Sequence, residues 1–209
     1  MSRQALDCYV EQSPGETRAA LVDADGLLQE MQVERVGRES LVGGLYLGRV
    51  IRAEKGMSAV FVDIGTGEPG IINRVKGVAE GEKLIVQVVR DARDGKGPAL
   101  TMKPTLLGRY LSYTPGRKGL NWARAIGKGG ARAALEGMLA DVLDGMDGFS
   151  VRGPATVVDK QMLEAEKHEL LDRWAALEDA ARGQKAPLAL QPAPAMLEQL
   201  LRDADPEAR

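Results

Sequence analysis

Eight lysine and arginine residues lie between Gly95 and Leu135, and no aspartate or glutamate lies among them. The aromatic residues Tyr110, Tyr113 and Trp122 fall in the same stretch. Cationic side chains neutralise phosphates, and aromatic rings stack on bases at about 1–3 kcal/mol per base. We therefore expect this segment to contact RNA or another single-stranded nucleic acid, rather than to be only a solubilising loop. The cations are Lys96, Lys103, Arg109, Arg117, Lys118, Arg124, Lys128 and Arg132.

The net charge of −2 conceals an uneven distribution of charge along the 209 residues. Residues 1–94 carry −3, residues 95–135 carry +8 and residues 136–209 carry −7. A basic segment between two acidic ones indicates a localised phosphate-binding surface, although the total charge alone would argue against one.

Two other patterns resemble ion-binding loops, and both are incomplete. Residues 23–26, Asp-Ala-Asp-Gly, begin like a calcium loop, but the glycine comes too early and no glutamate follows at the twelfth position. The glycine-rich residues 126–132 lack the Gly-Lys-Ser/Thr ending of a phosphate-binding loop. We interpret the first as a turn. At the second, backbone amides at a helix start, with Lys128 and Arg132 nearby, are expected to suit a phosphate.

No catalytic or metal centre is predicted. His168 is the single histidine and lies among acidic residues on a helical pattern, where a metal site would need further nitrogen or sulfur ligands. No nucleophile motif accompanies it. Asp141, Asp144 and Asp147 are spaced by three and could share a helix face to hold magnesium, but an exposed polar face explains them better.

The elements that would position the basic segment begin with short strands. Residues 5–10, 17–22 and 27–33 are apolar segments separated by turn residues, which predicts a three-stranded meander. Further short alternating segments with glycine at nearly every turn follow and predict a small closed antiparallel barrel, because closure removes exposed edges. Its expected strands are residues 46–54, 58–64, 70–72, 83–89 and 99–102.

After Pro115 the apolar period changes from two to 3.6. Apolar residues from Leu135 to Met146 predict an amphipathic helix, and residues 149–152 predict a short strand. Asp159 is expected to cap a long helix that ends before Gly183. A proline-rich break at residues 186–194 precedes a last short helix over residues 195–201.

The composition is that of a globular chain, with 44% apolar residues. The apolar runs are far shorter than the roughly 20 residues that span a bilayer, and no signal-peptide pattern follows the first residues. The single cysteine, Cys8, fits a reducing compartment. We therefore expect a cytoplasmic protein without a membrane span.

Five ordered sequence blocks with fitting gaps resemble those of the bacterial ribonuclease E/G family. The resemblance covers essentially the whole chain and weakens past residue 125. The blocks are LYLGRV at 45–50, AVFVDIG at 59–65, GEKLIVQV at 81–88, GKGPALT at 95–101 and LGRYL at 107–111.

The resemblance implies an α+β fold, in which an OB-fold β-barrel is inserted in a ribonuclease-H-like and 5′-sensor α+β region. The expected organisation has four parts. These are the N-terminal strands of a ribonuclease-H-like subdomain at 1–34, an OB-fold RNA-binding barrel at 35–106, a 5′-sensor-like domain at 107–186, and a C-terminal helix and tail at 187–209.

The resemblance also implies an RNA-binding face on the barrel. Phe61 is similar to the family's RNA-packing aromatic residue, although a buried core phenylalanine is the competing interpretation, and Lys96 is similar to a basic RNA contact. Ile71 stands where the family usually has a second aromatic residue, so stacking there is lost. With the basic segment, the predicted RNA-binding residues are Tyr46, Phe61, Ile71, Lys96, Lys103, Arg109, Arg124, Lys128 and Arg132.

For the 5′-sensor, Gly108 and Arg152 match residues that resemble the family's phosphate-binding set. An arginine fork holds a terminal phosphate through two hydrogen bonds. Gly153 replaces the family's hydroxyl residue and removes a donor, for which backbone amides could compensate. The predicted 5′-phosphate-binding residues are Gly108, Arg152 and Gly153.

The function implied is that of the RNA-holding, 5′-monophosphate-sensing half of an endoribonuclease of RNA decay and of RNA processing, including rRNA processing. Single-stranded RNA is the expected partner. Whether the chain also binds a second copy of itself or another protein stays open. The family's magnesium-binding aspartates belong to a later nuclease domain, so we expect no cofactor in this chain and no cleavage by it alone. Two alternatives stay open: the N-terminal fragment of an intact magnesium-dependent endoribonuclease, and a scaffold that docks a protein on the helices around Leu135 and Leu163.

Overall fold

The structure is a computed structural model that describes residues 6–54, 56 and 58–203. It divides into two compact units. One comprises the described residues of Met1–Leu41 and Ala193–Arg209, and the other comprises Val42–Pro192.

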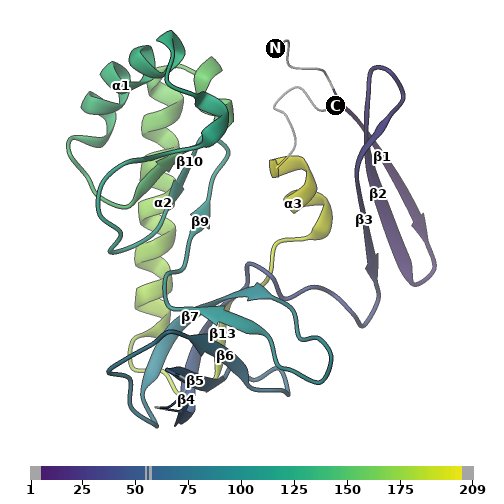
Figure 1. The fold of residues 1–209 in the computed structure, drawn as a ribbon, viewed down its shortest axis with the longest axis vertical. Helices are drawn as coiled ribbons and strands as arrows, with labels where there is room; N and C mark the ends of the chain where they lie inside the picture. Colours follow the sequence, from purple (N-terminus) through teal and green to yellow (C-terminus); the bar gives the residue numbers. More distant parts are fainter. Residues whose placement is uncertain (1–5, 55, 57, 204–209) are drawn as a thin grey trace. The chain divides into compact units, whose positions relative to one another are not determined.

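The first unit is a meander with one helix. β1 (Leu6–Ser13), β2 (Glu16–Asp23) and β3 (Leu28–Arg35) pair antiparallel in the order β1-β2-β3, as predicted (Figure 1). Gly15 and Gly26 adopt positive φ in the two connecting turns. The helix α3 (Met196–Asp203) contributes to a small core that consists of Ala19, Leu21, Met196 and Leu200, with Leu6, Cys8 and Leu197 packed against it.

The second unit contains the predicted barrel. Val50, Val62 and Val86 are fully buried inside it, because alternate residues of each strand face inward. The strands follow the order β4-β5-β6-β8-β7, and pairing of β4 with β7 closes the barrel. They are β4 (Leu45–Glu54), β5 (Ala59–Asp63), β6 (Gly70–Asn73), β7 (Lys83–Arg90) and β8 (Ala99–Thr101).

A sixth strand, β13 (Leu188–Gln191), extends this sheet. It pairs antiparallel with Leu45–Leu47, the part of β4 that precedes the pairing of β4 with β5. The sequence predicted only a proline-rich break here. That prediction was wrong because this short strand is specified by an available partner edge rather than by its own pattern.

The residues that follow the barrel strands in the sequence form a second, smaller sheet with the order β11-β12-β10-β9. Only β12 was predicted, because glycine and Gly153-Pro154 delimit it on either side, whereas strands of two or three residues carry no readable period by themselves. The strands are β9 (Leu106–Leu107), β10 (Leu111–Tyr113), β11 (Asn121–Trp122) and β12 (Phe149–Val151).

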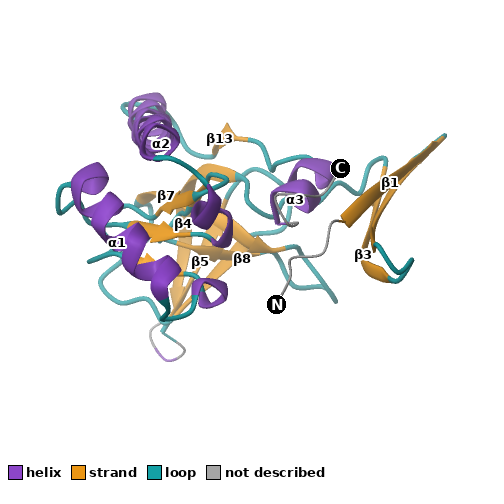
Figure 2. Ribbon diagram, turned by 90° about the horizontal axis from the view of Figure 1, so that it is seen from above, coloured by secondary structure: helices purple, strands orange, loops and turns teal. Residues whose placement is uncertain are grey.

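Two helices share a core with this sheet. α1 (Gly130–Leu143) begins before the apolar pattern, and Asp144 in the left-handed conformation ends it before Met146. α2 (Lys160–Ala181) is capped as predicted, since Asp159 Oδ1 accepts a hydrogen bond from the Met162 amide at 2.9 Å. Figure 2 shows the two helices together at one side of the barrel strands.

Leu135 on α1 and Leu163 on α2 are buried in this shared core. The scaffold alternative placed a partner protein on these apolar stripes. The stripes are used inside the chain, so that alternative has lost its structural basis.

The structure confirms the α+β class and a closed five-stranded, OB-like barrel. The domain boundaries, the ribonuclease-H-like identity of residues 1–34 and the sensor identity of residues 107–186 stay predictions. Among the described residues, the helices are too short or too polar to cross a membrane.

Candidate nucleic-acid interface

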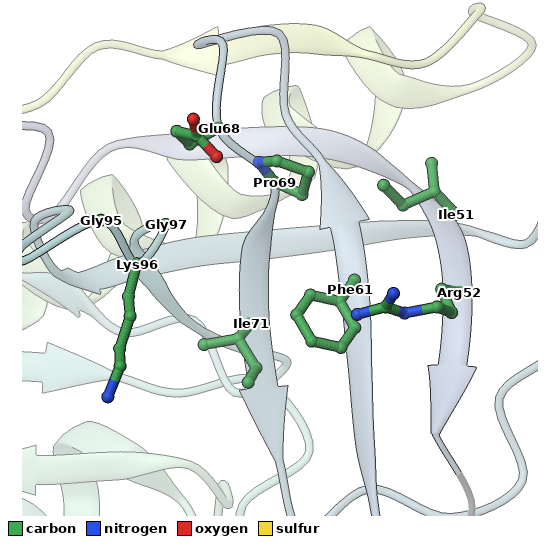
Figure 3. A pocket seen from close by; sticks show the side chains of 9 residues that line it. All are labelled: Ile51, Arg52, Phe61, Glu68, Pro69, Ile71, Gly95, Lys96 and Gly97. Carbon is green, nitrogen blue, oxygen red and sulfur yellow. The ribbon is translucent and has the colours of Figure 1, made fainter.

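A concave pocket of about 660 Å³ lies on the outer face of the barrel (Figure 3). Its centre is a row across three strands, in which Arg52 of β4 pairs with Phe61 of β5 and Phe61 pairs with Ile71 of β6. The loop with Lys96 borders the pocket beside Ile71, and Ile51 and Pro69 also line it. The pocket thus combines an apolar floor with a cation on either side.

A β-bulge directs Arg52 to this face. The register of β4 against β5 shifts between Val50 and Arg52, so that Ile51 is the extra residue. Strict alternation would turn the side chain of Arg52 inward, like that of buried Val50. With the bulge, Ile51 and Arg52 both lie on the outer surface, and Arg52 lies opposite Phe61.

The loop between β7 and β8 brings Lys96 to the pocket. Arg93 and Lys96 exchange two backbone hydrogen bonds of 2.9 and 3.0 Å, which close a tight turn. Gly97 then passes so close to Pro69 that a Cβ atom would lie 1.9 Å from the Pro69 carbonyl oxygen. Only glycine allows this close approach. Next to it, the Ile71 amide donates a hydrogen bond of 2.9 Å to the Pro98 carbonyl.

The pocket has a built-in cation–π contact. The guanidinium carbon of Arg52 lies 4.1 Å from the centre of the Phe61 ring, within the range of an attractive contact. Arg52 Nε also lies 3.2 Å from Glu54 Oε1. Glu68, next to Pro69, is the acidic residue among those that line the pocket. The arrangement suits a ligand with a flat apolar group and neighbouring negative charges.

The structure gathers Phe61, Ile71 and Lys96 at this pocket, and it places Tyr46 elsewhere. Tyr46 is only 6% exposed, and burial raises the pKa of its phenol. A contact between the Tyr46 ring and RNA stays a prediction that its burial does not favour. Sequence reasoning missed Arg52 and Glu68, because a bulge and a loop approach leave no pattern in the sequence.

The other cations of the basic segment do not line this pocket. Lys103, Arg124 and Lys128 are exposed, each at or near the end of an element of the second unit. Arg132 lies over the Trp122 ring, with its guanidinium carbon 4.5 Å from the ring centre, and its Nε lies 2.8 Å from Glu136 Oε1.

The acidic C-terminal segment partly neutralises the basic one. Glu136 pairs with Arg132, and Asp147 pairs with Lys118 at 3.1 Å. Asp147 also accepts a 2.7 Å hydrogen bond from the Gly119 amide. This hydrogen bond is the main cause that lowers the pKa of the Asp147 carboxyl group, and the interactions with Lys118 lower it further. The +8 of the linear segment therefore overstates its free positive charge.

The residues predicted to bind a 5′-phosphate come together at one end of the second sheet. β10 pairs with β12, and the Arg152 amide donates to the Tyr110 carbonyl at 2.8 Å. Gly108 lies in the turn that precedes Tyr110, and Gly153 follows Arg152 at the start of a 3₁₀ turn. Thr156 Oγ1 donates to the Gly153 carbonyl at 3.1 Å.

A carboxylate from α2 already occupies the amides of this turn. Glu166 accepts backbone hydrogen bonds from Arg109 at 2.5 Å, Tyr110 at 2.9 Å and Leu111 at 2.6 Å. A Cβ atom on Gly108 would lie 2.5 Å from the Glu166 carboxyl carbon, so the glycine makes room for this group. These three amides are engaged inside the chain rather than directed at a ligand.

The described residues include no group of three or more histidine, cysteine, aspartate or glutamate side chains that could hold a metal ion. His168 is exposed on α2. Asp141 pairs with Lys160 at 3.0 Å, and Asp144 and Asp147 lie beyond the last residue of α1, so the three carboxylates do not share a helix face.

Comparisons with known proteins agree with the sequence blocks. A family model described as the Ribonuclease E/G family matches residues 105–208. Ribonuclease G of Escherichia coli K12 is 32% identical over 225 residues, which cover 96% of this chain and 46% of that protein. Ribonuclease G of Haemophilus influenzae is 27% identical over 95% of the chain and 45% of that protein. Ribonuclease E of the same organism is 28% identical over 90% and 22%.

The chain thus spans less than half the length of these curated relatives. The similarity runs through both the barrel and the region that follows it. On these grounds, the chain belongs to the ribonuclease E/G family.

Proposed function

We propose that this chain holds single-stranded RNA on the outer face of its barrel, as a part of ribonuclease E/G-type RNA processing. The pocket at Phe61, Ile71 and Lys96 is the observation that carries the proposal. Its apolar floor suits an unstacked base, and Lys96 suits a backbone phosphate. Lys103, Arg109, Arg124 and Lys128 would add phosphate contacts along the strand.

The binding test uses a fluorescently labelled single-stranded oligoribonucleotide and its anisotropy. Replacing Phe61 and Lys96 together by alanine is expected to weaken binding by about tenfold or more, because one stacking contact and one phosphate contact are lost. The log–log salt dependence should become shallower by about 0.7, the contribution of one phosphate in single strands.

A matched control is the pair Val89→Ala and Lys185→Ala, which removes an exposed apolar residue and a cation outside the pocket. Binding should stay within about twofold of the unsubstituted chain, as expected for surface changes away from a site. Affinity that is the same at low and high salt, or equal loss in both double variants, would contradict the proposal.

The finer proposal is that Arg152 receives the 5′-monophosphate of the RNA. Its support is the convergence of Gly108, Arg152 and Gly153 at one end of the second sheet. Because Glu166 engages the amides of residues 109–111, the arginine fork would supply the main contact. The test compares the affinity of the chain for one oligonucleotide sequence in two forms, with a 5′-phosphate and with a 5′-hydroxyl. Equal affinity for the two forms would refute the proposal.

The chain is also proposed not to cleave RNA by itself. The support is the resemblance, in which the magnesium-binding aspartates belong to a separate nuclease domain. Incubation of the chain with RNA and magnesium, followed by electrophoresis, should leave the RNA intact. Cleavage that survives further purification would overturn this part of the proposal.

A further inference from the structure

We infer that Arg52 forms a base-stacking subsite on the barrel, in which a nucleobase lies on the outer face of its guanidinium group and the Phe61 ring supports the inner face. The inference rests on the proposed function, because it concerns how the same pocket would hold single-stranded RNA. It adds a residue that neither the sequence blocks nor the basic segment pointed to.

The first support is the geometry of the contact. The Arg52 guanidinium carbon lies 4.1 Å from the centre of the Phe61 ring, and Figure 3 shows the two side chains against one another. A base that enters the pocket therefore meets the guanidinium group before it can cover that face of the ring. Guanidinium planes accept stacked bases in single-stranded RNA recognition, as aromatic rings do.

The second support is that the side chain is held in place before a ligand arrives. The bulge at Ile51 turns Arg52 outward, and Glu54 Oε1 lies 3.2 Å from its Nε. Phe61 limits the remaining freedom of the group from below. A preorganised arginine loses less conformational entropy on binding than a free one would.

The third support is the chemistry of the neighbouring floor. Ile71, the cross-strand neighbour of Phe61 on the other side, offers an aliphatic surface without an aromatic face. Arg52 is therefore the second flat group of the row, and it also carries a charge that Ile71 lacks. With Lys96 at the opposite border, the pocket has a cation on each side of one base position.

The test separates stacking from charge with two probes. One is a labelled oligouridylate, and the other is an abasic oligonucleotide of equal length, which has the phosphates without the bases. Arg52→Lys keeps the charge and loses the planar group. It is expected to weaken oligouridylate binding by about fivefold or more, the lower end of one stacking contact, and abasic binding by less than about twofold.

Arg52→Ala removes the charge as well, so it should weaken binding of both probes and reduce the salt dependence. Arg49→Lys is the matched control, because Arg49 is an exposed arginine of the same strand outside the pocket. It should bind both probes like the unsubstituted chain. Denaturation midpoints of all variants establish that they are folded.

Three results would overturn the inference. If Arg52→Lys binds oligouridylate as the unsubstituted chain does, the guanidinium plane is not a stacking surface. If Arg52→Lys weakens both probes equally, the residue contacts phosphate and not base. If the unsubstituted chain binds neither probe, the proposed function fails, and the subsite fails with it.

Discussion

Glu166 supplies a negative charge to a turn whose amides would otherwise suit an external anion. Successive backbone N–H groups form concave anion-binding sites, and here the carboxylate of α2 occupies one. The three bonds fix residues 109–111, and the Tyr110 carbonyl in turn accepts from the Arg152 amide. Glu166 therefore holds the backbone to which Arg152, the predicted phosphate contact, is hydrogen-bonded.

Replacing Glu166 by alanine should lower the free energy of unfolding by about 2 kcal/mol, because hydrogen bonds to a charged group are lost. The measurement is urea denaturation followed by tryptophan fluorescence. Glu169→Ala is the control, since Glu169 is exposed on the same helix and pairs with Arg173 at 3.9 Å. Its effect should stay within about 0.5 kcal/mol. Equal effects of the two substitutions would show that the amide cluster does not depend on Glu166.

Residue types indicated the kind of chemistry but not every participant. Phe61 and Lys96 could be selected from the sequence blocks, and both line the pocket. Arg52 could not, because its orientation depends on one extra residue in β4. Tyr46 belongs to a matching block but is buried, since its position in the strand faces inward.

At the scale of elements, the approach of Gly97, in the loop before β8, to Pro69 shapes the pocket. Gly97→Ala would place a methyl group against the Pro69 carbonyl, so the loop with Lys96 must move. We expect a loss of about 1–3 kcal/mol in unfolding free energy, as in other overpacked sites, together with weaker binding of single-stranded RNA. Chemical denaturation and anisotropy measure the two effects.

Gly137→Ala is the control for this change. Gly137 lies within α1 and is exposed, and a Cβ atom there would meet no heavy atom within 4 Å. The substitution should stabilise the chain by up to about 1 kcal/mol through helix propensity and leave RNA binding unchanged. A Gly97→Ala chain as stable as the unsubstituted one would show that the close approach is not required.

Elements with a hydrophobic period or with turn residues on either side could be predicted, and short strands with neither could not. The meander, the five barrel strands, the capped helix at Asp159 and the strand at residue 149 carry clear patterns. Strands β9, β10 and β11 are only two or three residues long. β13 follows a cis Ala186–Pro187 bond in a proline-rich stretch and forms only because the edge of β4 is available.

At the scale of the whole molecule, the barrel sheet is extended by a strand from a distant part of the sequence. β13 follows α2 and pairs with Leu45–Leu47. Leu45 also belongs to the core that α1 and α2 share. The barrel and the region after it are thus joined by the β13–β4 pairing and by a common core. Removing either part would therefore expose strand edge and apolar surface of the other.

Two shortened chains test this dependence. A chain that ends at Pro192 keeps β13, whereas one that ends at Lys185 lacks it, and both lack α3. The shorter chain should lose about 2–3 kcal/mol of unfolding free energy, as expected for a few backbone hydrogen bonds, and should associate through its open edge. Tryptophan fluorescence reports this unit, because Trp122 and Trp174 both lie in it. Equal stability and equal elution volume of the two chains would contradict the expectation.

The pairing of β13 with β4 also sets an order of events during synthesis on the ribosome. Leu188 is made about 140 residues after Leu47, its partner in the sheet. At the usual rates of translation, this interval is on the order of 10 s. Through that time the first residues of β4 have left the ribosome without their final neighbour. Conditions that slow elongation therefore lengthen the period in which this strand is open to pairing with other nascent chains.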